Sequence, residues 1–173
     1  MVHNISTRPR ATPFIGFMAE TNPSLGRRGI RFLREYPELL KTQLRAVLEL
    51  AREFDVRVLV PMVTLPDDAS VVKEHLTQLC SEFGISSPPR LEAMIETPAV
   101  ALAAREIVKY VDFLIFGTND LTQYAFAADR ENAPVERYYK DASDVIFRLL
   151  RLTHDDVPDV PLSWCSEPLK RNQ

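Results

Sequence analysis

Cysteine and glycine are scarce in this sequence, and each scarcity excludes a class of protein. Only two cysteines occur among the 173 residues, Cys80 and Cys165, and they lie far apart along the chain. A small secreted scaffold held by disulfides would be denser in cysteine, so we expect two reduced thiols and a cytoplasmic location. The five glycines form neither a dinucleotide-binding fingerprint nor a phosphate-binding P-loop.

The sequence also lacks an excess of basic charge and any long apolar run. A net charge of -3 gives no basic footprint, so nucleic acid is not an expected partner. No apolar run approaches the roughly 20 residues that span a bilayer, so we expect no membrane association. A local group of basic side chains favours a small anion as ligand and consists of Arg27, Arg28, Arg31 and Arg34.

Apolar strand-like runs alternate with helical patterns along the chain. The expected strands are Arg28–Phe32, Arg57–Met62, Leu91–Ile95, Phe113–Phe116 and Val160–Trp164. The expected helices are Glu38–Phe54, Pro66–Phe83, Pro98–Tyr110, Asn119–Ala127 and Ala142–His154. This α/β alternation predicts a parallel sheet with right-handed crossovers. A closed barrel needs eight such units and roughly 250 residues, so the pattern allows a doubly wound sheet or an incomplete barrel.

Chemically active side chains follow three of the predicted strands directly. Glu96 follows the third strand, Asn119 and Asp120 follow the fourth, and Cys165 follows the last. The carboxyl ends of parallel strands are where active sites form, and neighbouring strands lie roughly 4.8 Å apart. Two carboxylates at neighbouring strand ends can share Mg²⁺, which proteins usually hold with one or two carboxylates, substrate oxygens and water.

Each of these residues also has a simpler interpretation. Glu96 precedes a predicted helix, and its negative charge could simply stabilise the N-terminus of that helix through the helix dipole. Asp120, with Gln123 three residues later, is similar to a capping box. Cys165 could be a small buried apolar residue. Their position at successive strand ends favours a common site.

Several motifs, taken together, resemble the phosphoenolpyruvate-utilising enzymes. Gly117-Thr-Asn-Asp-Leu-Thr-Gln-Tyr124 resembles the G-T-N-D-L-T-Q signature of that family. Asn22-Pro-Ser-Leu-Gly-Arg-Arg-Gly-Ile-Arg31 is similar to its N-P-x-L-G-x-R-x-I-R segment. Further matches in the same order are Val60-Pro-Met62, Ile95-Glu-Thr-Pro98 and Ala128-Asp-Arg130. Within the family, Tyr124 and Thr42-Gln-Leu-Arg-Ala46 resemble enzyme I of the sugar phosphotransferase system most.

The resemblance implies a fold and a function for the chain. It implies an incomplete TIM-type (β/α)₈ barrel over residues 13–173, lacking the first two strands and the last, after an irregular segment 1–12. It also implies the phosphoenolpyruvate-binding domain of an enzyme-I-type phosphotransferase, which passes a phosphoryl group to a protein histidine in sugar uptake. The alternatives are a fragment of a pyruvate phosphate dikinase or phosphoenolpyruvate synthase, and a non-catalytic remnant or binding module.

The resemblance implies partners that this chain would reach only through other domains. The swivelling domain with the phosphorylated histidine and the domain that docks the phosphocarrier protein lie outside the sequence, and His3, His75 and His154 are not in that histidine's motif. The chain alone is therefore expected to be inactive, although it would bind phosphoenolpyruvate or pyruvate. A homodimer is a further expectation from the family.

The resemblance also assigns roles to particular residues. The Mg²⁺ ligands are Glu96 and Asp120, and the groups that face the substrate are Asn119, Asp120, Arg130 and Arg28. Cys165 matches the thiol that protonates the enolpyruvate carbon as pyruvate forms. The family's M-C-G-E sequence around that thiol is replaced here by Trp164-Cys165-Ser166-Glu167.

Overall fold

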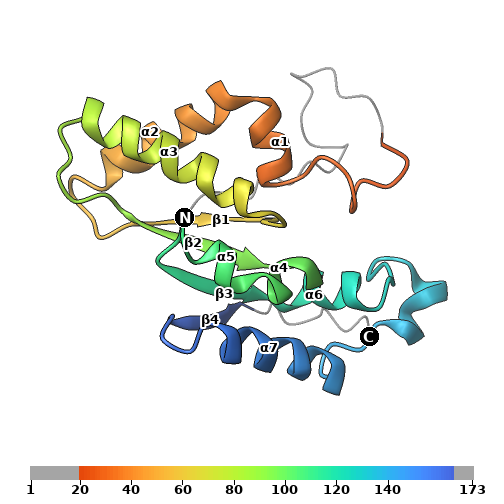
Figure 1. The fold of residues 1–173 in the computed structure, drawn as a ribbon. Helices are drawn as coiled ribbons and strands as arrows, with labels where there is room; N and C mark the ends of the chain where they lie inside the picture. Colours follow the sequence, from red (N-terminus) through yellow and green to blue (C-terminus); the bar gives the residue numbers. More distant parts are fainter. Residues whose placement is uncertain (1–19, 166–173) are drawn as a thin grey trace.

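A parallel sheet of four strands forms the centre of the structure, a computed structural model that describes residues 20–165 (Figure 1). The strands are β1 (Arg57–Val60), β2 (Arg90–Ile95), β3 (Phe113–Gly117) and β4 (Leu162–Cys165). They match four of the five predicted strands. The predicted irregular segment 1–12 lies outside the described residues, as does Glu167.

The strand order bears on the two folds that the pattern allowed. The order is β1-β2-β3-β4, so each strand pairs in parallel with the next strand of the sequence. A doubly wound sheet reverses its strand order at a switch point, whereas the order around a barrel never reverses. Unreversed order with right-handed crossovers places successive helices on one face of the sheet. The sheet is therefore consistent with a segment of a barrel.

Helices connect the strands, and most of them confirm the predicted pattern. They are α1 (Ile30–Glu35), α2 (Pro37–Leu50), α3 (Pro66–Glu82), α4 (Pro98–Leu102), α5 (Ala104–Ile107), α6 (Thr118–Ala125), the 3₁₀ helix η1 (Ala133–Tyr138) and α7 (Asp144–Asp156). Two begin with side-chain caps: the Thr97 hydroxyl accepts a hydrogen bond from the Val100 N–H, and the Ser143 hydroxyl accepts one from Ile146.

The strand predicted at Arg28–Phe32 is wrong, because this segment leads into α1. Gly29 has a φ of 54°, in the left-handed region that interrupts an extended chain. Ile30 and Leu33, three residues apart, are both buried on one face of the helix that follows. The apolar residues therefore reflect a short buried helix instead of a strand.

The helix predicted at Pro98–Tyr110 is broken at Ala103, and α7 stabilises the break. In a continuous helix the Ala101 carbonyl would accept the Arg105 N–H. Here the Thr153 hydroxyl donates to that carbonyl at 3.0 Å, and the Asp156 carboxylate accepts the Arg105 N–H at 3.0 Å. Because α7 satisfies both groups, the chain forms α4 and α5 as separate pieces.

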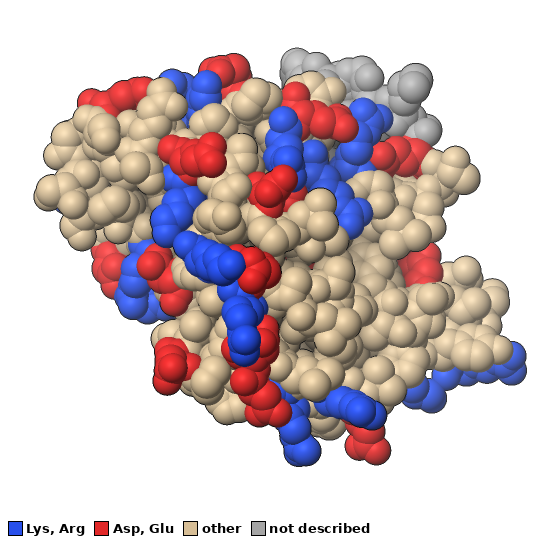
Figure 2. All heavy atoms as spheres, viewed as in Figure 1, with Lys and Arg blue, Asp and Glu red and all other residues tan. Residues whose placement is uncertain are grey.

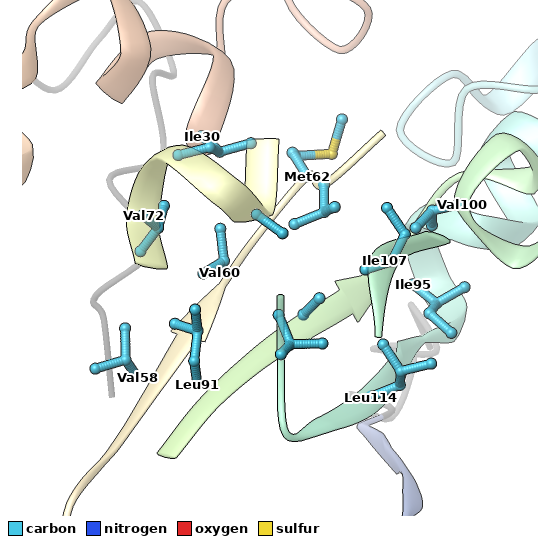
Figure 3. Close-up of a cluster of buried hydrophobic side chains, with 14 of the residues drawn as sticks. Ile30, Val58, Val60, Met62, Val72, Leu91, Ile95, Val100, Ile107 and Leu114 are labelled. Atoms are coloured by element: carbon cyan, nitrogen blue, oxygen red, sulfur yellow. The ribbon is translucent and has the colours of Figure 1, made fainter. Parts of the chain in front are cut away.

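The core lies between the sheet and the helices that cover it (Figure 3). Its strand residues include Val58, Val60, Leu91, Ile95 and Leu114, and its helix residues include Ile30, Val72, Val100 and Ile107. Cys80 of α3 belongs to this core and is buried. A packed core on one side fixes the strands, so the positions of their carboxyl ends are well defined.

Charge is mixed over the surface seen in Figure 2, where Lys and Arg side chains alternate with Asp and Glu. That face carries no large patch of a single sign. None of the helices between residues 20 and 165 is both long enough and apolar enough to span a bilayer.

Candidate functional site

Two buried carboxylates lie against each other at the carboxyl ends of β2 and β3. Glu96 directly follows β2 and is 3% exposed; Asp120 lies in the first turn of α6 and is 7% exposed. The backbone N–H of Met62, just beyond β1, donates to Glu96 Oε2 at 2.6 Å. Three neighbouring strands thus position this pair.

Arg28 forms a two-pronged ion pair with Asp120 from the segment before α1. Its Nη1 lies 3.3 Å from Asp120 Oδ1, and its Nη2 lies 3.2 Å from Oδ2. Burial alone would lower the pKa of the guanidinium, but the charges of Asp120, Tyr124 and Glu96 raise it above its ordinary value. Paired geometry of this kind is the strongest form of a guanidinium–carboxylate contact.

Tyr124 connects Arg28 to the surrounding backbone. Its hydroxyl accepts a hydrogen bond from Arg28 Nη1 at 3.1 Å and donates to the backbone carbonyl of Ser24. Burial is the main cause of a raised pKa for the Tyr124 phenol, which therefore stays a hydrogen-bond donor at neutral pH. In the sequence, Tyr124 is only a mark of resemblance, and no local pattern predicts this contact.

Local backbone geometry makes room for the carboxylates. A Cβ atom on Gly117 would lie 2.6 Å from Glu96 Cγ, closer than real side chains approach, so only glycine leaves space for Glu96 there. Met62 has a φ of 58°, an uncommon conformation for a residue with a side chain. Since its N–H is the donor to Glu96, this turn serves to orient the carboxylate.

Asn119 and Cys165 lie at the same strand ends, and Arg130 follows α6. The Tyr139 hydroxyl donates to the Asn119 carbonyl at 3.1 Å, and the Arg130 N–H donates to Gln123 Oε1 at 3.2 Å. Cys165 pairs in register with Gly117, two positions before Asn119, and its side chain is exposed. Five of the six predicted site residues therefore lie at or next to this edge of the sheet, and Arg28, Glu96 and Asp120 form one cluster there; Arg130 lies beyond the end of α6.

The simpler interpretations of these residues do not match the observed contacts. Asp120 is the third residue of α6, whose N-cap is Gly117, so its carboxylate is not a cap. Gln123 accepts from Arg130 instead of closing a capping box. The Glu96 carboxylate bonds to Met62 across the sheet, and Cys165 is exposed instead of buried.

Burial, together with the neighbouring charge of Asp120, raises the pKa of Glu96 to about 7, although the Met62 N–H and the charge of Arg28 both lower it. The ordinary value is 4.5, so the folded chain binds more protons than the unfolded chain between those two pH values. Without metal, the contribution of Glu96 to stability is therefore lost as pH rises through this window.

We expect Glu96→Gln to remove this pH dependence, because a glutamine cannot ionise. In urea unfolding with a chelator present, the variant should gain on the order of 2 kcal/mol over the parent chain between about pH 5 and about pH 8. The same stability difference between variant and parent at both pH values would contradict the burial of an ionisable Glu96 beside Asp120.

The two carboxylates fit a hard divalent cation. Within residues 20–165, no three His, Cys, Asp or Glu side chains gather as a metal cluster, so the protein itself would supply two ligands. Magnesium suits such a site because it takes one or two carboxylates and completes its shell with water and substrate oxygens. The pair already attracts one cation, the guanidinium of Arg28.

Comparison with known proteins points to one family. The family described as "PEP-utilising enzyme, PEP-binding domain" matches residues 5–161. A phosphoenolpyruvate-protein phosphotransferase of Mycoplasma pneumoniae is 39% identical over 153 residues, which cover 87% of this chain and 27% of the relative. A probable phosphoenolpyruvate synthase of Methanocaldococcus jannaschii is 38% identical over 140 residues, or 76% of this chain and 11% of the relative.

Another relative is multiphosphoryl transfer protein 2 of Escherichia coli, 33% identical over 142 residues that cover 79% of this chain and 17% of the relative. The chain thus spans about a quarter or less of the length of these relatives. Since the family match extends over nearly all of the described residues and the buried carboxylates lie within it, the chain belongs to the phosphoenolpyruvate-utilising enzymes, in the part that forms their PEP-binding domain.

Proposed function

We propose that the chain binds phosphoenolpyruvate at the carboxyl edge of its sheet, together with one Mg²⁺. The observation that carries this proposal is the buried pair of Glu96 and Asp120 beside the guanidinium of Arg28. The site combines two carboxylates, which suit a cation, with a guanidinium, which suits an anion. It therefore suits a ligand that contains both. Magnesium phosphoenolpyruvate has that composition.

Each residue has a proposed task in this site. Glu96 and Asp120 would hold Mg²⁺, which on binding neutralises phosphoryl oxygens during transfer. Asn119, in the first turn of α6, would donate to a phosphate oxygen. Arg130 and Arg28 would balance the remaining negative charge of the substrate. These assignments follow the family resemblance and are supported by the contacts of Arg28 with Asp120 and of Glu96 with Met62.

Cys165 would complete the chemistry on the carbon side of the substrate. When the phosphoryl group leaves the enol oxygen, the methylene carbon must take up a proton to become the methyl group of pyruvate. A thiol is mostly protonated at neutral pH and can donate that proton. The exposed thiol opposite Gly117 is accessible to a ligand bound over the strand ends.

In the complete reaction, the phosphoryl group would pass to a histidine outside this sequence. An enzyme-I-type phosphotransferase acting in cytoplasmic sugar uptake is our first proposal, since the relative of Mycoplasma pneumoniae is named a phosphoenolpyruvate-protein phosphotransferase. A phosphoenolpyruvate synthase fragment is the second, because that relative is nearly as similar, at 38% against 39% identity. Both share the site described above and differ in the phosphoryl acceptor.

A non-catalytic binding module is favoured by one observation. Within the described part of the chain, β1 and β4 each pair with a single neighbour, so both edges of the sheet are open. Trp164 on β4 is 76% exposed, which is unusual for a large aromatic side chain. A module of this kind would keep the fold without forming a working substrate site.

Thiol labelling distinguishes the substrate site from the non-catalytic module. We expect Cys165 to react with an alkylating reagent much faster than Cys80, because Cys80 is buried and burial raises the pKa of its thiol. Phosphoenolpyruvate with Mg²⁺ should slow the labelling of Cys165 and leave that of Cys80 unchanged. Fast labelling of Cys165 without protection would instead support the non-catalytic module.

A further inference from the structure

The site contains a cation of its own even without a metal. Both terminal nitrogens of Arg28 face Asp120, one on each carboxylate oxygen. The Arg28 side chain is only 18% exposed, so water screens this ion pair weakly. In the structure, the guanidinium therefore occupies the oxygens that a metal would need.

Tyr124 and Asp120 hold the same guanidinium from one helix. They lie four residues apart on α6 and are therefore neighbours on one face of that helix. Arg28 Nη1 donates to both of them, at 3.3 Å to Asp120 Oδ1 and 3.1 Å to the Tyr124 hydroxyl. The Tyr124 hydroxyl is fixed in turn by the Ser24 carbonyl. The Tyr124 hydroxyl thereby holds Arg28 Nη1 beside Asp120 Oδ1.

We propose that Arg28 is the resident counterion of Asp120, that a divalent cation displaces it, and that Tyr124 is a positioning residue that holds the guanidinium against Asp120. This inference rests on the metal site of the proposed function. It adds an order of events: the cation takes the carboxylate, and the freed guanidinium then faces the anionic substrate. Without metal, Asp120 neutralises Arg28 and the site attracts phosphate weakly.

Titration of the full 173-residue chain with Mn²⁺ alone tests this exchange. Arg28→Gln removes the competitor, so Mn²⁺ should bind about five- to tenfold more tightly than to the parent chain. Tyr124→Phe loosens the hold on Arg28 and should tighten Mn²⁺ binding by about twofold. In a chain that already carries Arg28→Gln, adding Tyr124→Phe should change nothing, because the hydroxyl acts only through Arg28.

Arg31→Gln is the matched control for the loss of one positive charge. Arg31 lies three residues further along and bonds to the Leu25 carbonyl and the Thr64 hydroxyl, away from both carboxylates. The Arg31→Gln variant should keep its Mn²⁺ affinity within about twofold of the parent value. If Arg31→Gln and Arg28→Gln tighten Mn²⁺ binding equally, the loss of any one positive charge explains the effect, and the inference is overturned.

The outcomes separate this inference from the proposed function. If the parent chain binds Mn²⁺ and Arg28→Gln binds it equally well or more weakly, the counterion role is wrong and the metal site stands. If neither chain binds Mn²⁺, both are wrong. Should Arg28→Gln fail to fold, as judged by circular dichroism, Tyr124→Phe decides: unchanged or weaker Mn²⁺ binding overturns the inference, and tighter binding supports it.

Discussion

Asp120→Asn is expected to weaken divalent-cation binding by at least about 100-fold, because it removes one of two protein ligands. The amide keeps the shape of the side chain but loses its charge, and Arg28 is left without its carboxylate partner. The pKa of Glu96 should also fall, since the charge of Asp120 is one of the causes that raise it. The variant thus changes both the affinity and its pH dependence.

Electron paramagnetic resonance of Mn²⁺ measures the free and bound ion directly in this experiment. Asp155→Asn is the matched control, because Asp155 is an exposed aspartate of α7 far along the chain from the site. It should bind Mn²⁺ like the parent chain. Retention of a tight Mn²⁺ site in Asp120→Asn would place the metal elsewhere in the molecule.

Leu44→Ala is expected to destabilise the fold by about 2–5 kcal/mol, the usual cost of a cavity in a packed core. Leu44 lies on the buried face of α2 and is 0% exposed. Leu50→Ala, on the same helix, is the matched control, because Leu50 is 53% exposed. Chemical denaturation should show a loss of less than about 0.5 kcal/mol for that variant.

Comparable losses for the two leucine variants would mean that α2 does not pack as described. A large loss for Leu44→Ala alone would show that the chain has a specific core without further barrel strands. That result matters for function, since the carboxylates need fixed strand ends to converge. It also shows whether the isolated chain is a suitable object for binding experiments.

Much of the fold could be predicted from residue patterns, because the signals were local. Short apolar runs predicted β1 to β4, and helical patterns between them predicted α2, α3, α6 and α7. The break at Ala103 could not be predicted, since it depends on Thr153 and Asp156 from a helix some 50 residues later. The helix α1 was misjudged because its apolar segment is too short to show a period.

The candidate site could be predicted in part, for a topological reason. Glu96 and Asp120 follow neighbouring parallel strands, so their convergence follows from the strand order. The contacts of Arg28 could not be derived in this way, because its partners lie 92 and 96 residues away. No local pattern marks Tyr124 as the residue that holds Arg28, and only the folded chain shows it.

Calorimetric titration of phosphoenolpyruvate into the 173-residue chain measures whether the ligand binds and whether binding needs Mg²⁺. We expect binding in the presence of Mg²⁺, and its loss when a chelator replaces the metal or when Asp120 is changed to Asn. The Asp155→Asn chain should bind as the parent does. Absence of binding to the parent chain, or equal affinity with Mg²⁺ and with chelator, would contradict a magnesium-dependent phosphoenolpyruvate site at this edge of the sheet.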